Sequence, residues 1–159
     1  MCDDTKYEFM PPVAPTPDEE GRLFSMAETC ERTGLPYETL KFYCNKGLVP
    51  GVRRDGRNRR VFDEATVRWV ESLQCLKHCG MSISEMQDYV DLCTAGEASL
   101  RERKAILAEK QHHLREELAA IQGAIDFIDQ KQAYYDDVLA GRTPYYSNLR
   151  TPAGEHPKG

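Results

Sequence analysis

The fold is decided by residues 25–62, whose sequence is SMAETCERTGLPYETLKFYCNKGLVPGVRRDGRNRRVF. Ser25 and Glu28 form an S-x-x-E capping box, in which each side chain accepts a hydrogen bond from a free backbone N–H at the other position. Gly34 can end this first helix in the left-handed conformation. Pro36 suits the first turn of a second helix, because its missing N–H costs nothing there. Two short helices joined by a Gly-Leu-Pro turn predict a helix-turn-helix.

The second half of the same stretch predicts a small two-stranded wing. The second helix is expected to end at Gly47, and apolar residues then flank Asp55-Gly56, a strong signal for a short hairpin turn. The arms and tip of this hairpin carry five arginines: Arg53, Arg54, Arg57, Arg59 and Arg60.

The second helix and the wing together have the chemistry that DNA binding requires. A slim helix enters the major groove from its N-terminal end, while cations and hydrogen-bond donors hold the flanking phosphates. Residues 37–60 hold seven basic and two acidic residues, although the whole chain has a net charge of -5. The alternative, an ordinary helical corner beside a solvated loop, is disfavoured by the arginines. With Leu40 facing inward, we expect DNA contacts from the wing arginines and from Tyr37, Glu38, Thr39, Lys41, Phe42 and Tyr43.

Two further helices are expected before a longer regular segment. A third should run from Asp63 to Cys79, and a fourth opens with a second capping box, Ser82 with Glu85, and ends near Gly96. The first 96 residues therefore hold four predicted helices and the wing.

A long helix is predicted next, opened by a third capping box, Ser99 with Glu102. Apolar residues recur every seven positions along it, which is typical of a coiled coil. At 1.5 Å per residue this helix is roughly 60 Å long, too long to bury its stripe against so small a body. A second copy of the chain is therefore implied, with a dimerisation surface formed by Leu100, Leu107, Leu114, Leu118, Ile121, Ile125, Ile128, Tyr135 and Leu139.

These elements define a mainly α fold class: a winged helix-turn-helix DNA-binding domain with a small β-hairpin wing, followed by a long coiled-coil dimerisation helix. The expected division is a flexible tail over 1–21, the DNA-binding domain over 22–96, the coiled-coil helix over 97–140 and a flexible tail over 141–159. No apolar run is long enough to span a membrane and the N-terminus lacks the order of a signal peptide, so we expect a cytoplasmic protein.

The chain resembles the MerR family of bacterial transcriptional regulators over residues 23–94. The family pattern has a Thr-Gly turn, a Leu-Arg-Tyr-Tyr reading helix, a Gly-Leu pair, a wing closed by Gly-Tyr-Arg-x-Tyr, and a Gly-apolar-Ser before the fourth helix. The coiled-coil helix to residue 140 is also similar to the family. The matching residues are Thr33-Gly34, Leu40-Lys41-Phe42-Tyr43, Gly47-Leu48, Asn58-Arg59-Arg60-Val61-Phe62 and Gly80-Met81-Ser82.

The resemblance implies a homodimer held by an antiparallel coiled coil that binds palindromic promoter DNA. Family members distort DNA between promoter elements so that RNA polymerase can use them. By position, Lys41, Phe42, Tyr43 and Arg60 fall where the family contacts DNA. Glu38 departs from a position that is often basic, so it should repel phosphate or accept from a cytosine amino group. Phe42 lacks the family's hydroxyl.

The six cysteines are expected to be thiols rather than disulfides in a cytoplasmic chain. Cys44 and Cys75 occupy positions that are usually polar in the family, so they are possible redox thiols and thiol oxidation is a possible effector. Cys75, His78 and Cys79 lie close enough on one helix for a metal, but Cys79 falls where the family has small or apolar residues. We therefore expect no metal and no cofactor.

Two other functional classes compete with a DNA-binding regulator. A coiled-coil protein-interaction module with a degenerate DNA-binding domain is favoured slightly by Glu38 and by the acidic total charge. An enzyme is disfavoured, because the sequence contains no nucleophile–base pair, phosphate loop or paired-carboxylate motif.

Overall fold

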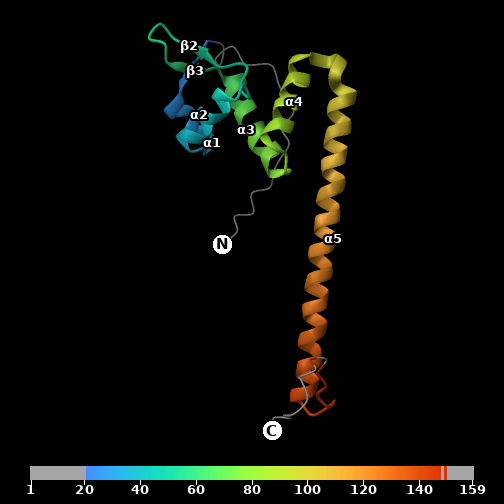
Figure 1. The fold of residues 1–159 in the computed structure, drawn as a ribbon. Coiled ribbons are helices and arrows are strands. Elements are labelled where there is room, and N and C mark those ends of the chain that lie inside the picture. Colours follow the sequence, from blue (N-terminus) through green and yellow to red (C-terminus); the bar gives the residue numbers. More distant parts are fainter. Residues whose placement is uncertain (1–20, 148, 150–159) are drawn as a thin grey trace. The chain divides into compact units, whose positions relative to one another are not determined.

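The structure, a computed structural model, describes residues 21–147 and residue 149. The predicted N-terminal tail, except Gly21, and most of the C-terminal tail lie outside these residues. The described part divides into two units, the first ending at His113 and the second beginning at Leu114. The elements are β1 (Phe24–Ser25), α1 (Met26–Thr33), α2 (Tyr37–Asn45), β2 (Arg53–Arg54), β3 (Arg60–Phe62), α3 (Glu64–His78), α4 (Ile83–Thr94), the 3-10 helix η1 (Gly96–Ser99) and α5 (Leu100–Leu139) (Figure 1).

Two of the three predicted capping boxes are confirmed. The backbone N–H of Ser25 donates to Glu28 at 2.8 Å and that of Glu28 donates to the Ser25 hydroxyl at 3.2 Å. Ser82 and Glu85 make the same exchange at 2.7 and 3.2 Å. Gly34 ends α1 with a φ of 70°, the left-handed conformation that the sequence predicts.

The third capping box, at Ser99, is wrong. The Ser99 hydroxyl donates to the carbonyls of Leu92 and Gly96, and it accepts a hydrogen bond from Arg103 Nε at 3.0 Å. Ser99 is only 4% exposed and so joins the end of α4 to the start of α5. The S-x-x-E pattern did not anticipate η1, which occupies the positions before Leu100.

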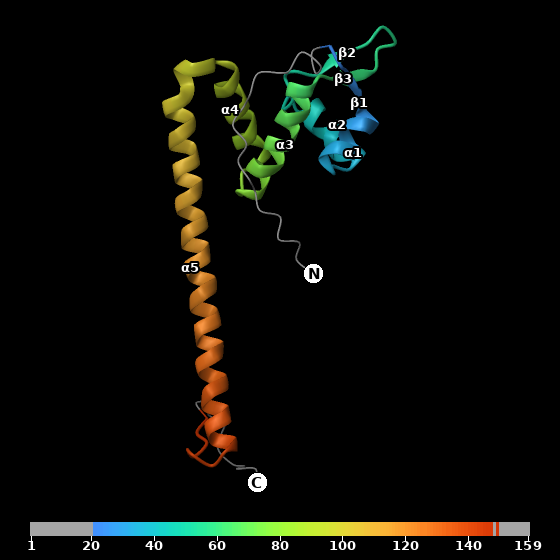
Figure 2. The same cartoon turned by 180° about the vertical axis from the view of Figure 1, so that it is seen from behind.

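The wing has a third strand that the sequence analysis did not predict. The strand order is β1-β3-β2 and both pairs are antiparallel (Figure 2). Phe24 lies opposite Phe62 and Arg54 opposite Arg60. The pairing of β1 with β3 fixes the wing to the start of α1, since Ser25 is both the end of β1 and the cap of that helix.

The hairpin turn also differs from the predicted two-residue Asp55-Gly56 turn. Asp55 N donates to Arg59 O and Asn58 N donates to Asp55 O, each at 2.9 Å, so the loop is longer. Asn58 takes the positive φ, at 61°, and Gly56 does not. Asparagine tolerates this conformation better than most residues, which explains why it can replace glycine here.

The core of the first unit lies between α1, α2, α3 and α4 and the inner side of the sheet. Its largest fully buried apolar side chains come from α2, α3, α4, the central strand β3 and the loops beside them. They are Phe62, Leu40, Leu48, Leu73, Met81, Met86, Val49, Val67 and Val70.

Glu64, 7% exposed, receives two hydrogen bonds of 2.6 Å from the Arg32 guanidinium. These hydrogen bonds hold the pKa of the Glu64 carboxyl below its usual value.

Helix α5 has no buried residue along its 40 positions. Most of its large apolar side chains are exposed, among them Leu118 at 65% and Ile121 at 58%, whereas Ile106 is partly buried against the core of the first unit. In the second unit the helix ends at Leu139 and the chain turns back at Gly141. None of the helices within the described residues combines the length and the apolar character needed to cross a bilayer.

Candidate DNA-binding interface

Helix α2 presents its polar side outward because its apolar side belongs to the core. Leu40 is fully buried, as predicted, and Tyr43, three residues on, is 5% exposed. Tyr37, Glu38 and Lys41 are all exposed, and Glu38 and Lys41, three residues apart, share one face of the helix. Burial raises the pKa of the Tyr43 hydroxyl. The ring of Tyr43 therefore packs in the core, and any contact with DNA is limited to its hydroxyl.

The two departures from the family pattern on α2 each have a cation beside them. Glu38 lies 3.7 Å from Lys41 Nζ, so a neighbouring positive charge offsets its repulsion of phosphate. Lys46 Nζ lies 5.7 Å from the centre of the Phe42 ring, within the range of a cation–π contact. Phe42 thus keeps a positive group near its exposed face.

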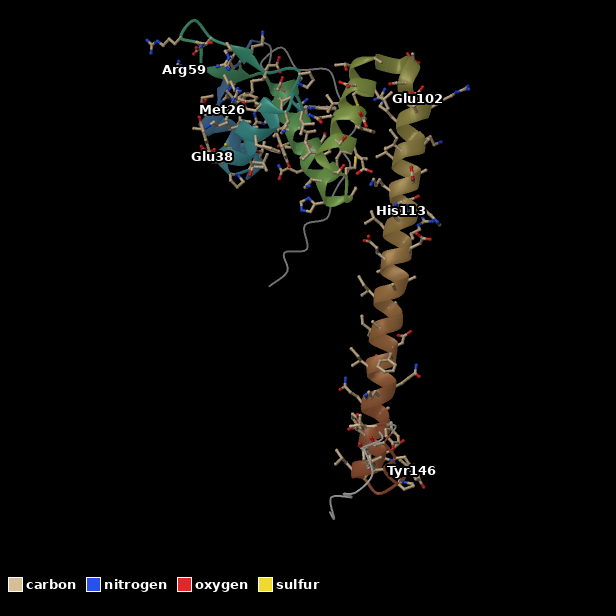
Figure 3. All side chains as sticks on the ribbon, in the orientation of Figure 1. Met26, Glu38, Arg59, Glu102, His113 and Tyr146 are labelled. Carbon is tan, nitrogen blue, oxygen red and sulfur yellow. The ribbon has the colours of Figure 1, made fainter. Side chains whose placement is uncertain are left out.

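Asp55 organises the wing tip. Its carboxylate accepts hydrogen bonds of 2.9 Å from the backbone N–H groups of Arg57 and Arg59, and a further one from Arg59 Nε. The backbone hydrogen bond from Arg59 is the main reason that the pKa of Asp55 lies below its usual value. Figure 3 places Arg59 at the end of the wing, and its guanidinium pairs with the Asp55 carboxylate at 2.8 Å.

Arg53, Arg54 and Arg60 are each held by a neighbour of different chemistry. Arg60 Nη2 donates to Asn45 Oδ1, at the end of α2, at 2.6 Å. Arg54 donates to the carbonyl of Asn58 at 2.8 Å, and Arg53 pairs with Asp63 at 3.3 Å. The contact between Arg60 and Asn45 joins the wing directly to the reading helix.

A hollow of about 420 Å³ lies between the start of α1, the exposed side of α2 and the wing. Four cationic side chains and one carboxylate line it, so its charge suits a phosphate backbone. The lining residues are Ser25, Met26, Ala27, Tyr37, Lys41, Arg54, Asp55, Arg59, Arg60 and Val61.

The structure brings five of the predicted DNA-contacting residues together in this hollow: Tyr37, Lys41, Arg54, Arg59 and Arg60. The other predicted contacts on α2 (Glu38, Thr39, Phe42, Tyr43) and on the wing (Arg53, Arg57) do not line it.

Two contributions to this surface were not predicted from the sequence. The first is the start of α1, where the capping box at Ser25 could have drawn attention to the free N–H groups and positive end of a helix. The second is Asn45, whose contact with Arg60 depends on the tertiary fold and leaves no local signal.

The cysteines differ in exposure. Cys75 is exposed, whereas Cys44 is half-buried, so Cys75 is the more accessible of the two candidate redox thiols. Burial raises the pKa of both thiols, against the opposing effect of Arg60 and Arg54 at Cys44. Among the residues that the structure describes, no three His, Cys, Asp or Glu side chains are grouped so that they could hold a metal ion.

Two family models match the chain. The model described as the MerR HTH family regulatory protein matches residues 24–93, and that described as MerR, DNA binding matches residues 67–131. Together they cover the helix-turn-helix, the wing, α3, α4 and most of α5. The chain belongs to the MerR family. It is therefore a transcriptional regulator of a DNA-binding family, and not an enzyme.

Similar proteins agree with this assignment. A Haemophilus influenzae HTH-type transcriptional regulator is 28% identical over 74% of this chain and 87% of its own length. The Bacillus subtilis regulator AdhR is 34% identical over 58% of this chain and 66% of its own. The structure of HiNmlR, a MerR family regulator lacking the sensor domain and bound to promoter DNA, matches with a TM-score of 0.62 at 28% identity, covering 75% of this chain and 94% of that one. A putative MerR regulator from Listeria monocytogenes matches with a TM-score of 0.66 at 28% identity, covering 75% and 90% of the two chains.

Proposed function

We propose that this MerR regulator binds a palindromic promoter site as a homodimer and controls transcription by distorting the DNA. The observation that carries the proposal is the cationic hollow between α1, α2 and the wing. Lys41 lies on the side of α2 that would face the major groove, and Arg54, Arg59 and Arg60 lie beside it for the flanking phosphates. The promoter-bound state of the similar HiNmlR supports DNA as the ligand.

The exposed stripe on α5 supports a homodimer. Residues such as Ile121, 58% exposed, and Ile128, 53% exposed, have no apolar cover within their own unit. Burial of a leucine or isoleucine side chain contributes about 1.5–3 kcal/mol, so a partner helix would stabilise the chain strongly. The proposed contact surface comprises Leu100, Leu107, Leu114, Leu118, Ile121, Ile125, Ile128, Tyr135 and Leu139.

The charges of α5 favour antiparallel pairing. Residues 100–110 hold four basic and two acidic residues, a net charge of +2. Residues 126–139 hold one basic and four acidic residues, a net charge of -3. Antiparallel helices bring these oppositely charged ends together, whereas parallel helices would set like charges beside each other. A twofold arrangement of this kind is what a palindromic site matches.

Distortion of the promoter for RNA polymerase is part of the proposal by family resemblance. The effector is proposed to act through thiol oxidation. Cys75 is the stronger of the two candidates because it is exposed and Cys44 is half-buried. The raised pKa of Cys75 means that little thiolate forms at neutral pH, so we expect a slow response to strong oxidants rather than a fast one.

Selection of bound fragments from random duplex DNA by the purified protein, with and without oxidant, tests this function. We expect a palindrome with two half-sites to be enriched, and we expect oxidation to change its recovery in the native protein but not in a Cys75→Ser variant. Failure to enrich any sequence, with no retarded band on random duplex at low salt, would contradict DNA binding and favour an interaction module.

A further inference from the structure

A small apolar hollow lies on the first unit, on the side of α3 and α4. Its volume is about 190 Å³ and it is lined by Pro50, Trp69, Val90, Cys93 and Thr94. An apolar cavity of about 150 Å³ is large enough to hold a benzene ring. Trp69 donates its indole N–H to the Leu48 carbonyl at 2.7 Å, so the polar edge of the ring is already satisfied and the rest can accept apolar contact. The hollow therefore has the size and chemistry to receive one aromatic side chain.

The rim of this hollow is tied to the first turn of α5. Arg103 Nη1 lies 3.7 Å from Cys93 Sγ, and Arg103 Nη2 donates to the Gly96 carbonyl at 2.9 Å. The buried Ser99 hydroxyl, which donates to Leu92, joins the same elements. These contacts hold the hollow beside the N-terminal end of α5.

The other end of α5 carries an ordered segment with exposed aromatic rings, which we call the hook (residues 141–147). Arg142 pairs with Asp137 at 2.6 Å. The Tyr134 hydroxyl accepts a hydrogen bond of 2.8 Å from the backbone N–H of Tyr146, which fixes the hook against the helix. The backbone of the hook is therefore held in place, while the side chains of Tyr145 and Tyr146 remain 61% and 76% exposed.

We infer that the hook of one copy covers the apolar hollow of the other, with the ring of Tyr145 or Tyr146 seated against Trp69 and Val90. The inference rests on the proposed antiparallel dimer, in which the C-terminal end of one α5 lies beside the N-terminal end of its partner. The opposite charges of those two ends favour the same approach. A clamped segment with two exposed rings then meets a hollow of matching size, and both lose their exposed apolar surface.

Crosslinking to Cys93 tests this contact directly. In the full chain with Cys75→Ser, either Tyr145→Cys or Tyr146→Cys is treated with a short bis-maleimide and run on a denaturing gel. We expect a covalent dimer from at least one of the two variants, and its loss when Cys93→Ser is added. A covalent dimer that survives Cys93→Ser, or none from either variant, would overturn the inference.

Trp69, the single tryptophan of the chain, gives a second readout. The Tyr145→Ala/Tyr146→Ala protein should show increased acrylamide quenching of Trp69 and emission shifted to longer wavelength. Phe127→Ala, which removes another exposed ring of the second unit, should leave both signals unchanged. Unchanged Trp69 signals in the double variant would overturn the inference.

Light scattering on the same samples distinguishes a missing contact between hook and hollow from a missing dimer. A dimer that fails both tests would overturn the contact between hook and hollow but leave the proposed function standing. A native chain that is monomeric at micromolar concentration would overturn both.

Discussion

Arg60 in the wing and Asn45 at the end of α2 are joined by a hydrogen bond of 2.6 Å. The bond spans the two elements that DNA must meet together, the reading helix and the arginine-bearing strand β3. Since Arg60 also lines the cationic hollow, Asn45 fixes the position of a proposed phosphate contact without lying on the hollow itself. The contact therefore relates the fold of the first unit to its affinity for DNA.

Replacement of Asn45 by Ala should weaken DNA binding without unfolding the protein. Loss of one exposed hydrogen bond to a charged group costs about 1 kcal/mol, or roughly a fivefold rise in Kd. Fluorescence anisotropy on the selected duplex measures it. As a comparison, Lys46→Ala on the neighbouring residue removes a charge and should reduce the salt dependence of DNA binding. A Kd for Asn45→Ala equal to that of the native protein would show that Arg60 does not need the hydrogen bond to Asn45.

Replacement of Arg60 by Ala should weaken binding to all sequences, because the lost contact is to phosphate. The slope of log K against log salt should fall by about one unit. Titrations at several salt concentrations, on the selected duplex and on a scrambled one, measure this slope. A loss confined to the selected duplex, with an unchanged slope, would mean that Arg60 contacts a base instead.

Replacement of Asp55 by Ala should loosen the wing tip. Asp55 holds the backbone and side chain of Arg59 and the backbone of Arg57, so both arginines would lose their fixed positions. We expect a several-fold weaker affinity for DNA at neutral pH, although a negative charge has been removed. Asp88→Ala, an exposed acidic residue on α4, is the control; tighter binding by Asp55→Ala than by this control would indicate that charge outweighs positioning.

These cases show what the sequence could and could not predict. The capping boxes at Ser25 and Ser82 are local patterns, and they located α1 and α4 correctly. The contact of Asn45 with Arg60 and the pairing of Phe24 with Phe62 join distant segments, so no window of sequence could reveal them.

The two incorrect predictions, at the wing tip and at Ser99, also have physical causes. At the wing tip the left-handed residue is Asn58 rather than Gly56, because both types can adopt that conformation and the register of β2 with β3 decides between them. At Ser99 the sequence matches the capping pattern, but the Ser99 hydroxyl is buried and donates to carbonyls of α4 and η1 instead.

Lowering the pH should weaken the contact between α4 and α5 that Glu85 makes with Lys110. The hydrogen bond from Lys110, at 2.7 Å, is the main cause that lowers the pKa of Glu85 from 4.5 to about 2. Because the folded pKa is the lower one, the contact stabilises the fold above pH 4.5 and is lost as the pH falls toward 2. The difference in Tm between native protein and Glu85→Gln should shrink over this range. Glu102→Gln, at a carboxylate without an ion pair among the described residues, should show no such trend.

The most direct measurement is the mass of the protein–DNA complex for native protein and for an Ile121→Asp variant. An unpaired buried charge costs several kcal/mol in a helix interface, so the variant should be monomeric. Light scattering with the selected duplex should give two native chains per duplex and no stable complex for Ile121→Asp. A native complex of one chain per duplex, or full affinity of the monomeric variant, would contradict a regulator that presents its cationic hollow twice through paired α5 helices.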